Sequence, residues 1–340
     1  MQYLYVLTSS PKDSYYEQLL LSVTSLRLVM PEAKITLLCD RKTREGLAGK
    51  RCEYEKYVSD IITADAPSDM PQVEVSRWVK TSMRSLIKGD FLFIDTDTII
   101  TDNLASIAEQ GIKFGACLDK HSLIESHGKK DNILENDKRL GFISHLSGRH
   151  YNSGVIFCAD IPETRKIFDR WHELWLLSVS KNIARDQPSF NMAIHENSPL
   201  FTELNGIWNC QIAFNGLPYL AGAKVIHYFA SDLTMHTSPF LPASGWVFNK
   251  IKDNGFIPDE ILELLKNPKA AFMPESRIIA GHDTLSVINS SLFDIVLWIR
   301  KKLPGFFKFL NGLCYINKKI AKFFVVKANR KKTSGIKHYN

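Results

Sequence analysis

Two aspartates separated by one residue follow a short apolar run, and they are the residues of this sequence best suited to chemistry. They are Asp95 and Asp97, directly after Phe-Leu-Phe-Ile at residues 91–94. Carboxylates at positions i and i+2 beyond a buried strand can converge on one hard cation, and Mg²⁺ and Mn²⁺ favour oxygen ligands. Such a cation can neutralise a diphosphate leaving group. The pair therefore predicts a divalent-metal site that serves a phosphate-bearing ligand.

Three further polar residues follow apolar runs in the same way, namely Thr8, Asp40 and Asp119. The apolar runs predict strands at residues 3–7, 34–39, 91–94, 114–118, 154–158 and 224–229. Ligands of open α/β sheets bind beyond the carboxyl ends of the strands. We therefore expect these polar side chains near Asp95 and Asp97, in one site at one edge of the sheet.

Helices are predicted between these strands, over residues 14–30, 73–88 and 162–179. Ser14 and Glu17 match a capping box at the start of the first helix, and Gly89 is placed to end the second. The alternation of strands and helices is typical of a parallel α/β sheet. The predicted fold is a Rossmann-like, mostly parallel central sheet flanked by helices, with a basic amphipathic helical tail. Residues 120–150 show no clean period and are expected to form a long loop or lid.

Five ordered segments make the chain resemble nucleotide-sugar glycosyltransferases of the GT-A fold, most like glycosyltransferase family 8. They are residues 3–10, 76–85 leading to the paired aspartates, 151–154 (Tyr-Asn-Ser-Gly), 185–187 (Arg-Asp-Gln) and 225–228 (Val-Ile-His-Tyr). The sequence after His227 departs from the family, because the glycine and the Lys-Pro-Trp segment that commonly follow are missing. We therefore expect a divergent member, in which either His227 or His236 completes the metal site.

The resemblance implies a role for each matching residue. Asp95, Asp97 and His227 would bind a divalent metal, Mn²⁺ or Mg²⁺, that bridges the diphosphate of the donor. Asp186 and Gln187 would be the catalytic residues, at the sugar and the reaction centre. The residues implied in nucleotide-sugar binding are Thr8, Ser9, Arg77, Lys80, Thr96, Asn152, Ser153 and Gly154, the last three as a turn beside the donor sugar.

Plainer structural explanations stand beside these roles. His227 lies in an apolar strand and would also suit the core as a structural histidine. Arg77, Lys80 and Arg84 share one helix face, which would also suit a solvated surface. The three residues from Asn152 match an ordinary turn. The assignment of these residues to a site therefore depends on the resemblance.

The activity that the resemblance implies is hexosyl transfer. A sugar would move from a nucleotide diphosphate sugar, implied to be a UDP-sugar, to a hydroxyl of a saccharide or lipid-linked acceptor. The resemblance also implies retention at the anomeric carbon and a role in surface polysaccharide or glycolipid synthesis. Two alternatives stay open. Asp95 and Asp97 also resemble the nucleophile motif of haloacid-dehalogenase-type phosphatases, and the chain could bind nucleotide sugars without catalysis.

Composition excludes several other classes of protein. The 340 residues are 45% hydrophobic and 23% charged, which is incompatible with a disordered or collagen-like chain. No apolar run approaches the roughly 18 residues of a spanning helix, and the N-terminus does not match a secretory signal. The six cysteines have no CxxC or metal-type spacing and are expected to be reduced thiols. These features predict a cytoplasmic protein.

Positive charge is concentrated at the C-terminus. Residues 295–340 contain twelve lysines and arginines and no acidic residue, whereas the preceding part holds 31 basic and 36 acidic residues. Apolar residues at helical spacing accompany these charges, which predicts peripheral attachment of residues 292–332 to an anionic membrane at its inner, cytoplasmic face. No nucleic acid is expected, and a helical layer packed on the core is the alternative. The predicted domains are residues 1–285, with halves 1–119 and 120–285, and a tail over 286–340.

Overall fold

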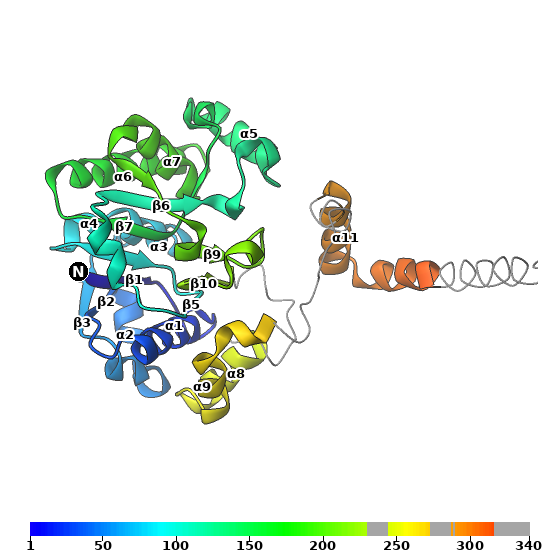
Figure 1. Cartoon of the computed structure of the whole chain (residues 1–340), viewed down its shortest axis with the longest axis horizontal. Helices are drawn as coiled ribbons and strands as arrows, with labels where there is room; N and C mark the ends of the chain where they lie inside the picture. Colours follow the sequence, from blue (N-terminus) through cyan, green and yellow to red (C-terminus); the bar gives the residue numbers. More distant parts are fainter. Residues whose placement is uncertain (230–243, 273–286, 288–289, 316–340) are drawn as a thin grey trace, which may run out of the picture. The chain divides into compact units, whose positions relative to one another are not determined.

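A computed structural model describes residues 1–229, 244–272, 287 and 290–315 of the chain (Figure 1). The chain divides into two compact units, residues 1–277 and residues 278–340. His236 and residues 316–332 of the predicted membrane segment lie outside the described residues.

A seven-stranded sheet forms the centre of the first unit (Figure 1). Its strands, in spatial order, are β3 (Asp60–Ala64), β2 (Ile35–Asp40), β1 (Gln2–Leu7), β4 (Phe91–Ile94), β7 (Tyr151–Cys158), β6 (Phe114–Leu118) and β8 (Phe201–Glu203). Neighbouring strands pair in parallel, except that β7 runs antiparallel to both β4 and β6. Strands β2, β4 and β7 are buried along their whole length, as a sheet covered on both faces requires. The predicted fold class, a mostly parallel α/β sheet flanked by helices, is confirmed.

A second sheet of three short strands contains β10 (Val225–His227) between β5 (Thr98–Ile100) and β9 (Cys210–Gln211). Strand β10 runs antiparallel to β5, and the register pairs His227 with Thr98. Only residues 95–97 separate β4 from β5, so the aspartate motif is the link between the two sheets. The strand register therefore brings His227 next to Asp97, although the two are distant in sequence.

Helices bury two separate hydrophobic cores. One core contains α1 (Tyr15–Val29), α8 (Gly245–Asn254) and α9 (Asp259–Lys266). The other contains α3 (Gln72–Thr81), α4 (Met83–Leu86), α6 (Pro162–Ser180) and α7 (Gln187–Glu196). Alternate strand residues enter opposite cores, for example Leu37 the first and Leu38 the second. Because both faces of the sheet are covered, a ligand can approach the central strands only at their ends.

Two predicted helical features differ in detail from the structure, and a short helix after β2 was not predicted. Helix α1 begins where predicted, but the Ser14 side chain makes no capping hydrogen bond. Asp13 takes that role, because its carboxylate accepts a hydrogen bond from the backbone N–H of Tyr15 at 3.1 Å. The helix predicted over residues 73–88 is divided at Ser82 into α3 and α4. Helix α2 (Arg41–Gly46) was not predicted, and Asp40 caps it instead of reaching the aspartate motif.

Two predictions about the middle of the chain are wrong. Residues 120–150 are not a plain loop, because they contain α5 (Lys130–Leu140), a helix that buries only Ile133, Asp137 and Leu140. The three residues from Asn152 do not form a turn, because they lie inside β7. The strand starts at Tyr151, whose backbone N–H and carbonyl both hydrogen-bond to the Asn191 side chain, at 2.6 and 3.0 Å.

The second unit begins its described part with α11 (Ser291–Lys302), and helical turns continue over residues 304–315. The helix is interrupted at Leu303, before Pro304, where the sequence predicts a break. No described residue of α11 is buried. Large apolar side chains of this unit are 39% to 68% exposed; they are Leu292, Ile295, Val296, Trp298, Leu303, Phe306, Phe309, Leu313 and Tyr315. None of the helices in the described ranges is long and apolar enough to cross a membrane.

Candidate active site

A cleft of about 340 Å³ opens at the carboxyl ends of β1 and β4. Because β7 runs antiparallel to β4, the beginning of β7 lies beside the end of β4, and the backbone N–H of Asp95 donates to the carbonyl of Gly154 at 2.7 Å. Helix α3 and the start of α7 provide the other walls. The volume lies within the range of small-molecule sites.

Three potential metal ligands meet at the lip of this cleft. One ligand atom each from Asp95, Asp97 and His227 lies within 4.8 Å of the others. The Nε2 atom of His227 is 3.1 Å from Oδ1 of Asp97. Two carboxylates suit Mg²⁺ or Mn²⁺, and neutral imidazole is a common metal ligand. The grouping of His227 with the two aspartates, which sequence left open, is therefore present in the structure.

The backbone beneath these ligands leaves room for a cation site because residue 154 is glycine. A Cβ atom on Gly154 would lie 2.5 Å from Cε1 of His227 and 3.0 Å from Oδ2 of Asp95. It would also lie 2.8 Å from the amide oxygen of Asn152. No other residue type allows these side chains to approach the strand so closely. The residues present therefore fit a divalent cation.

A buried hydrogen-bond network holds the histidine from behind. The Nδ1 atom of His227 is 2.9 Å from Oδ1 of Asn209, which can only accept a hydrogen bond. This contact places the proton on Nδ1 and leaves the Nε2 lone pair for a cation. Asn209 donates to Asn152 at 2.9 Å, and Asn152 donates to Asp119 at 2.9 Å. Asn152 therefore positions His227 through Asn209.

Asp119 ends this network as a charged carboxylate. Its Oδ2 atom is 3.0 Å from Nε2 of His127. Burial alone would raise the pKa of Asp119, but hydrogen bonds from His127 and Asn152 and the nearby His150 lower it well below its usual range. Asp119 thus lies behind the cleft as a structural anion.

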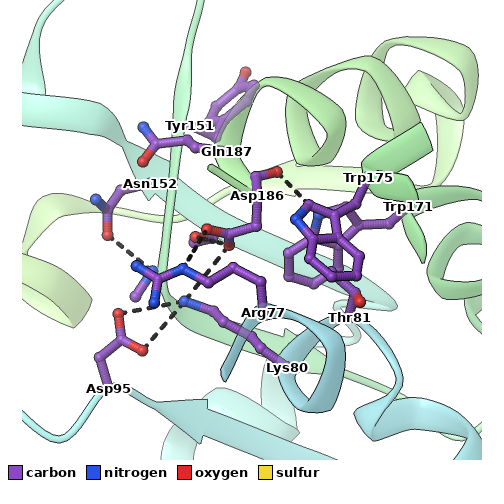
Figure 2. Close-up of polar contacts among 12 residues, drawn as sticks. Arg77, Lys80, Thr81, Asp95, Tyr151, Asn152, Trp171, Trp175, Asp186 and Gln187 are labelled. Carbon is purple, nitrogen blue, oxygen red and sulfur yellow. Dashed lines mark hydrogen bonds and ion pairs between the residues drawn. The ribbon is translucent and has the colours of Figure 1, made fainter. Parts of the chain in front are cut away.

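Two cations of α3 enter the cleft beside Asp95 and Asp186 (Figure 2). The Lys80 ammonium is 3.2 Å from Asp95 and 3.8 Å from Asp186, and Arg77 Nε is 3.9 Å from Asp186. Burial raises the pKa of Asp95 although Lys80 opposes the shift. For Asp186 the same burial is outweighed by Lys80 and Arg77, which lower its pKa. Because only 12% of the Lys80 side chain is exposed, this lysine does not belong to a solvated surface.

The start of α7 is fixed by the two tryptophans of α6 (Figure 2). Trp171 Nε1 donates to the carbonyl of Asp186 at 3.1 Å, and Trp175 Nε1 donates to the carbonyl of Ala184 at 3.1 Å. The Asp186 carboxylate accepts a hydrogen bond from the Ser153 hydroxyl at 3.0 Å. These contacts fix the position of the Asp186 carboxylate at the wall of the cleft.

Most of the residues predicted for the site line this one cleft; they are Thr8, Arg77, Lys80, Asp95, Thr96, Asp97, Asn152, Ser153, Gly154, Asp186, Gln187 and His227. Ser9 does not, because its hydroxyl donates to Asp13 and accepts from Arg51, both at 2.6 Å. Arg84 is fully buried and donates to the carbonyl of Gly89 at 3.0 Å, which is a structural role.

Two residues of the site were not predicted from the sequence. Asn209 is the last residue of a short 3-10 helix (Gly206–Asn209) before β9, and nothing in its sequence neighbourhood signals a role. Phe229 stacks on the His227 ring, with centroids 4.0 Å apart and planes 12° from parallel. Phe229 lies beyond the end of β10 and its φ of 51° is in the left-handed region, so the alternation of a strand could not have placed its ring there.

No protein-family model and no curated protein matches the sequence. Solved structures resemble the fold. The apo structure of the bifunctional glycosyltransferase WbbM gives a TM-score of 0.50 at 15% identity, covering 78% of this chain and 50% of that one. The galactosyltransferase LgtC, in complex with donor and acceptor sugar analogs, has a TM-score of 0.49 and 14% identity. The match covers 78% of this chain and 100% of that one. Mouse xyloside xylosyltransferase 1, in its apo form, has a TM-score of 0.47 and 13% identity. The match covers 68% of this chain and 98% of that one.

At such low identity the likeness to WbbM shows the fold alone, and that fold is of the GT-A type. The site adds its own evidence against the phosphatase alternative. That alternative needs further carboxylates at the cation, whereas the third residue of the cluster here is His227. It also expects the aspartate motif after the first strand, whereas Asp95 follows β4.

Proposed function

We propose that this protein transfers a sugar from a nucleotide diphosphate sugar to a hydroxyl of a saccharide or lipid-linked acceptor. The observation that carries the proposal is the convergence of Asp95, Asp97 and His227 at a cleft into which Lys80 and Arg77 also point. A diphosphate leaving group needs a cation and further fixed positive charge, and this arrangement provides both.

Each part of the cleft has a distinct task in this proposal. A bound Mn²⁺ or Mg²⁺ would neutralise the charge that develops on the departing diphosphate. Asp186, held ionised by its basic neighbours, faces the sugar and stabilises positive charge at the anomeric carbon. Gln187 presents its amide at the same end of the cleft. Thr8 and Thr96 line the nucleotide side.

The finer assignments rest on the resemblance to glycosyltransferase family 8. They are a UDP-sugar donor, Mn²⁺ as the metal, hexosyl transfer with retention, and a role in surface polysaccharide or glycolipid synthesis. The geometry supports the coarser part of the first two, a diphosphate-bearing donor and a divalent metal, because a carboxylate and imidazole cluster lies beside basic side chains. The non-catalytic alternative gives no reason for Asp186 to be held ionised beside Gln187.

Thermal unfolding of the full chain against a panel of nucleotide sugars tests the donor proposal. A UDP-sugar at about a hundred times its Kd should stabilise the fold by about 2.7 kcal/mol in the presence of Mn²⁺. The melting temperature should therefore rise by several degrees, and EDTA should remove the shift. GDP-sugars at equal concentration serve as the control. The absence of a shift with every nucleotide sugar, in both Mn²⁺ and Mg²⁺, would refute the proposal.

We further propose that α11 and the turns after it attach the protein to the cytoplasmic face of an anionic membrane. Apolar side chains such as Leu292, Trp298 and Phe306 are about half exposed or more, and Arg300, Lys301 and Lys302 close the helix. This combination suits a helix that lies in the headgroup region. A lipid-linked acceptor would then be presented where the protein is bound.

Vesicle sedimentation tests the membrane proposal. Each basic residue near an anionic surface contributes about 1 kcal/mol, so replacing Arg300, Lys301 and Lys302 with glutamine should weaken binding to phosphatidylglycerol-containing vesicles about a hundredfold. The full chain should bind neutral phosphatidylcholine vesicles far less strongly. Replacing Lys34, Lys42 and Lys56 of the first unit with glutamine gives the control for charge alone. Equal binding by both triple variants would rule the proposal out.

A further inference from the structure

A second cavity adjoins the donor cleft and shares Gln187 and Phe229 with it. Its volume is about 90 Å³, the room of roughly three water molecules. Phe214 and Phe229 form an aromatic wall, with ring centroids 5.0 Å apart. A cavity of this size takes one edge of a sugar ring with its hydroxyl groups, and the remainder of the molecule stays outside.

Two residues that line this cavity each carry a buried polar atom with no hydrogen-bond partner among the described residues. They are Oδ1 of Asp137 and Nδ1 of His150, on residues that are 0% and 5% exposed. The other oxygen of Asp137 is satisfied by Ser144 and His145, so only one acceptor is left over. Burial lowers the pKa of His150 to about 4, so this imidazole is neutral at pH 7. A hydroxyl group, which donates and accepts, matches both atoms.

The backbone around the cavity is strained. In the described part of the chain five residues other than glycine have positive φ, and four of them are Lys120, His121, Asn215 and Phe229. Lys120 and Phe229 line the cavity, and Asn215 donates to the carbonyl of Lys120. Buried Gln211 holds the turn by accepting from the Lys120 N–H at 2.6 Å. Such strain persists where the surrounding structure holds it in place, and it concentrates at functional sites.

Two cationic side chains lie at the rim of the cavity. Lys129 and Arg185 are exposed lining residues, and neither side chain makes a hydrogen bond or ion pair to any residue that the structure describes. The lining carboxylates do not neutralise them, because Asp119 is bound to His127 and Asn152, and Asp137 to Ser144 and His145. Two cations beside a pocket that matches hydroxyl groups indicate a ligand that carries both hydroxyls and an anion.

We propose that this cavity binds an acidic acceptor saccharide, with ring hydroxyls at Asp137 and His150 and a carboxylate or phosphate group at Lys129 and Arg185. This proposal rests on the proposed function, because the acceptor hydroxyl must face a donor sugar in the adjoining cleft. Gln187, which lines both cavities, lies where the two ligands would meet.

Isothermal titration of the full chain distinguishes the parts of the proposal. The probes are methyl glucoside, methyl glucuronide, glucose 6-phosphate and inorganic phosphate. We expect at least one of the two acidic sugars to bind about tenfold more tightly than methyl glucoside, since a charged hydrogen bond is added. The preferred acid identifies the anion as a carboxylate or a phosphate. Inorganic phosphate should bind more weakly than glucose 6-phosphate, because it lacks the ring hydroxyls.

Variants locate the binding site. Arg185→Gln and Lys129→Gln should each remove most of the preference for the acidic sugar, whereas Lys130→Gln, an exposed lysine outside the cavity, should not. Equal binding of neutral and acidic sugars, no binding of any sugar, or a preference that survives in both variants would overturn the proposal. UDP with Mn²⁺ is titrated into the same proteins. Failure of UDP to bind would refute the donor assignment. The measured preference for the acidic sugar would be unaffected by that result.

Discussion

Replacing Asp95 and Asp97 together with asparagine is expected to lower sugar transfer, or hydrolysis of the donor, by about 10² to 10³-fold or more. Asparagine keeps the size of each side chain but removes the negative charge that holds a divalent cation. The same variant should lose the Mn²⁺-dependent rise in melting temperature. Turnover of a UDP-sugar, followed as release of UDP, measures the first effect.

The fold itself should tolerate this double replacement. Burial raises the pKa of Asp95, which means that its ionised form is disfavoured in the folded protein, and a neutral amide removes that cost. Asp102→Asn is the matched control, because Asp102 is an exposed aspartate whose carboxylate pairs with Lys224 at 3.1 Å, away from the cleft. Full activity in the double variant would refute the role of the aspartates as metal ligands.

Gly154→Ala is expected to lower activity about a hundredfold, because the added methyl group displaces neighbouring side chains without changing any charge. The added methyl group would lie 2.5 Å from His227 and 3.0 Å from Asp95, so both ligands must move. Displacement of a catalytic centre by about 1 Å is sufficient for a loss of that size. The affinity for Mn²⁺ should fall as well, and titration of the metal in the presence of UDP measures it.

The control for this prediction is Gly245→Ala. A Cβ atom at Gly245 meets no atom within 4 Å, and the residue begins α8 in helical conformation, so alanine should be neutral. Thermal unfolding without metal shows whether Gly154→Ala is still folded. If the folded variant binds Mn²⁺ and turns over donor as the natural protein does, the close packing around residue 154 has no functional importance.

The part of the fold that sequence predicts well is the part fixed by local pattern. The strands around Tyr5, Leu37 and Phe93 are continuous apolar runs, and such runs have few alternatives in a covered sheet. The aspartate motif was placed correctly because it follows one of these runs.

What sequence could not predict depends on contacts between distant segments. The residues from Asn152 look like a turn by composition, but antiparallel pairing with β4 and the side chain of Asn191 draw them into β7. Helix α5 was missed because it buries only three side chains, including Asp137, and so shows little apolar periodicity. Asn209 is recognised only when β9 and β10 pair and bring it behind His227.

The buried network that runs from His227 through Asn209 and Asn152 to Asp119 has an evolutionary consequence. Substitutions at residues joined in one network show energetic coupling of about 0.5 to 3 kcal/mol. The effect of a mutation at Asp119 should therefore depend on the residue at position 227. Lys129 and Arg185 are exposed at the second cavity and are not part of this network. Diversification of ligand preference in descendants of this chain should accumulate at those exposed cations while the buried polar residues stay invariant.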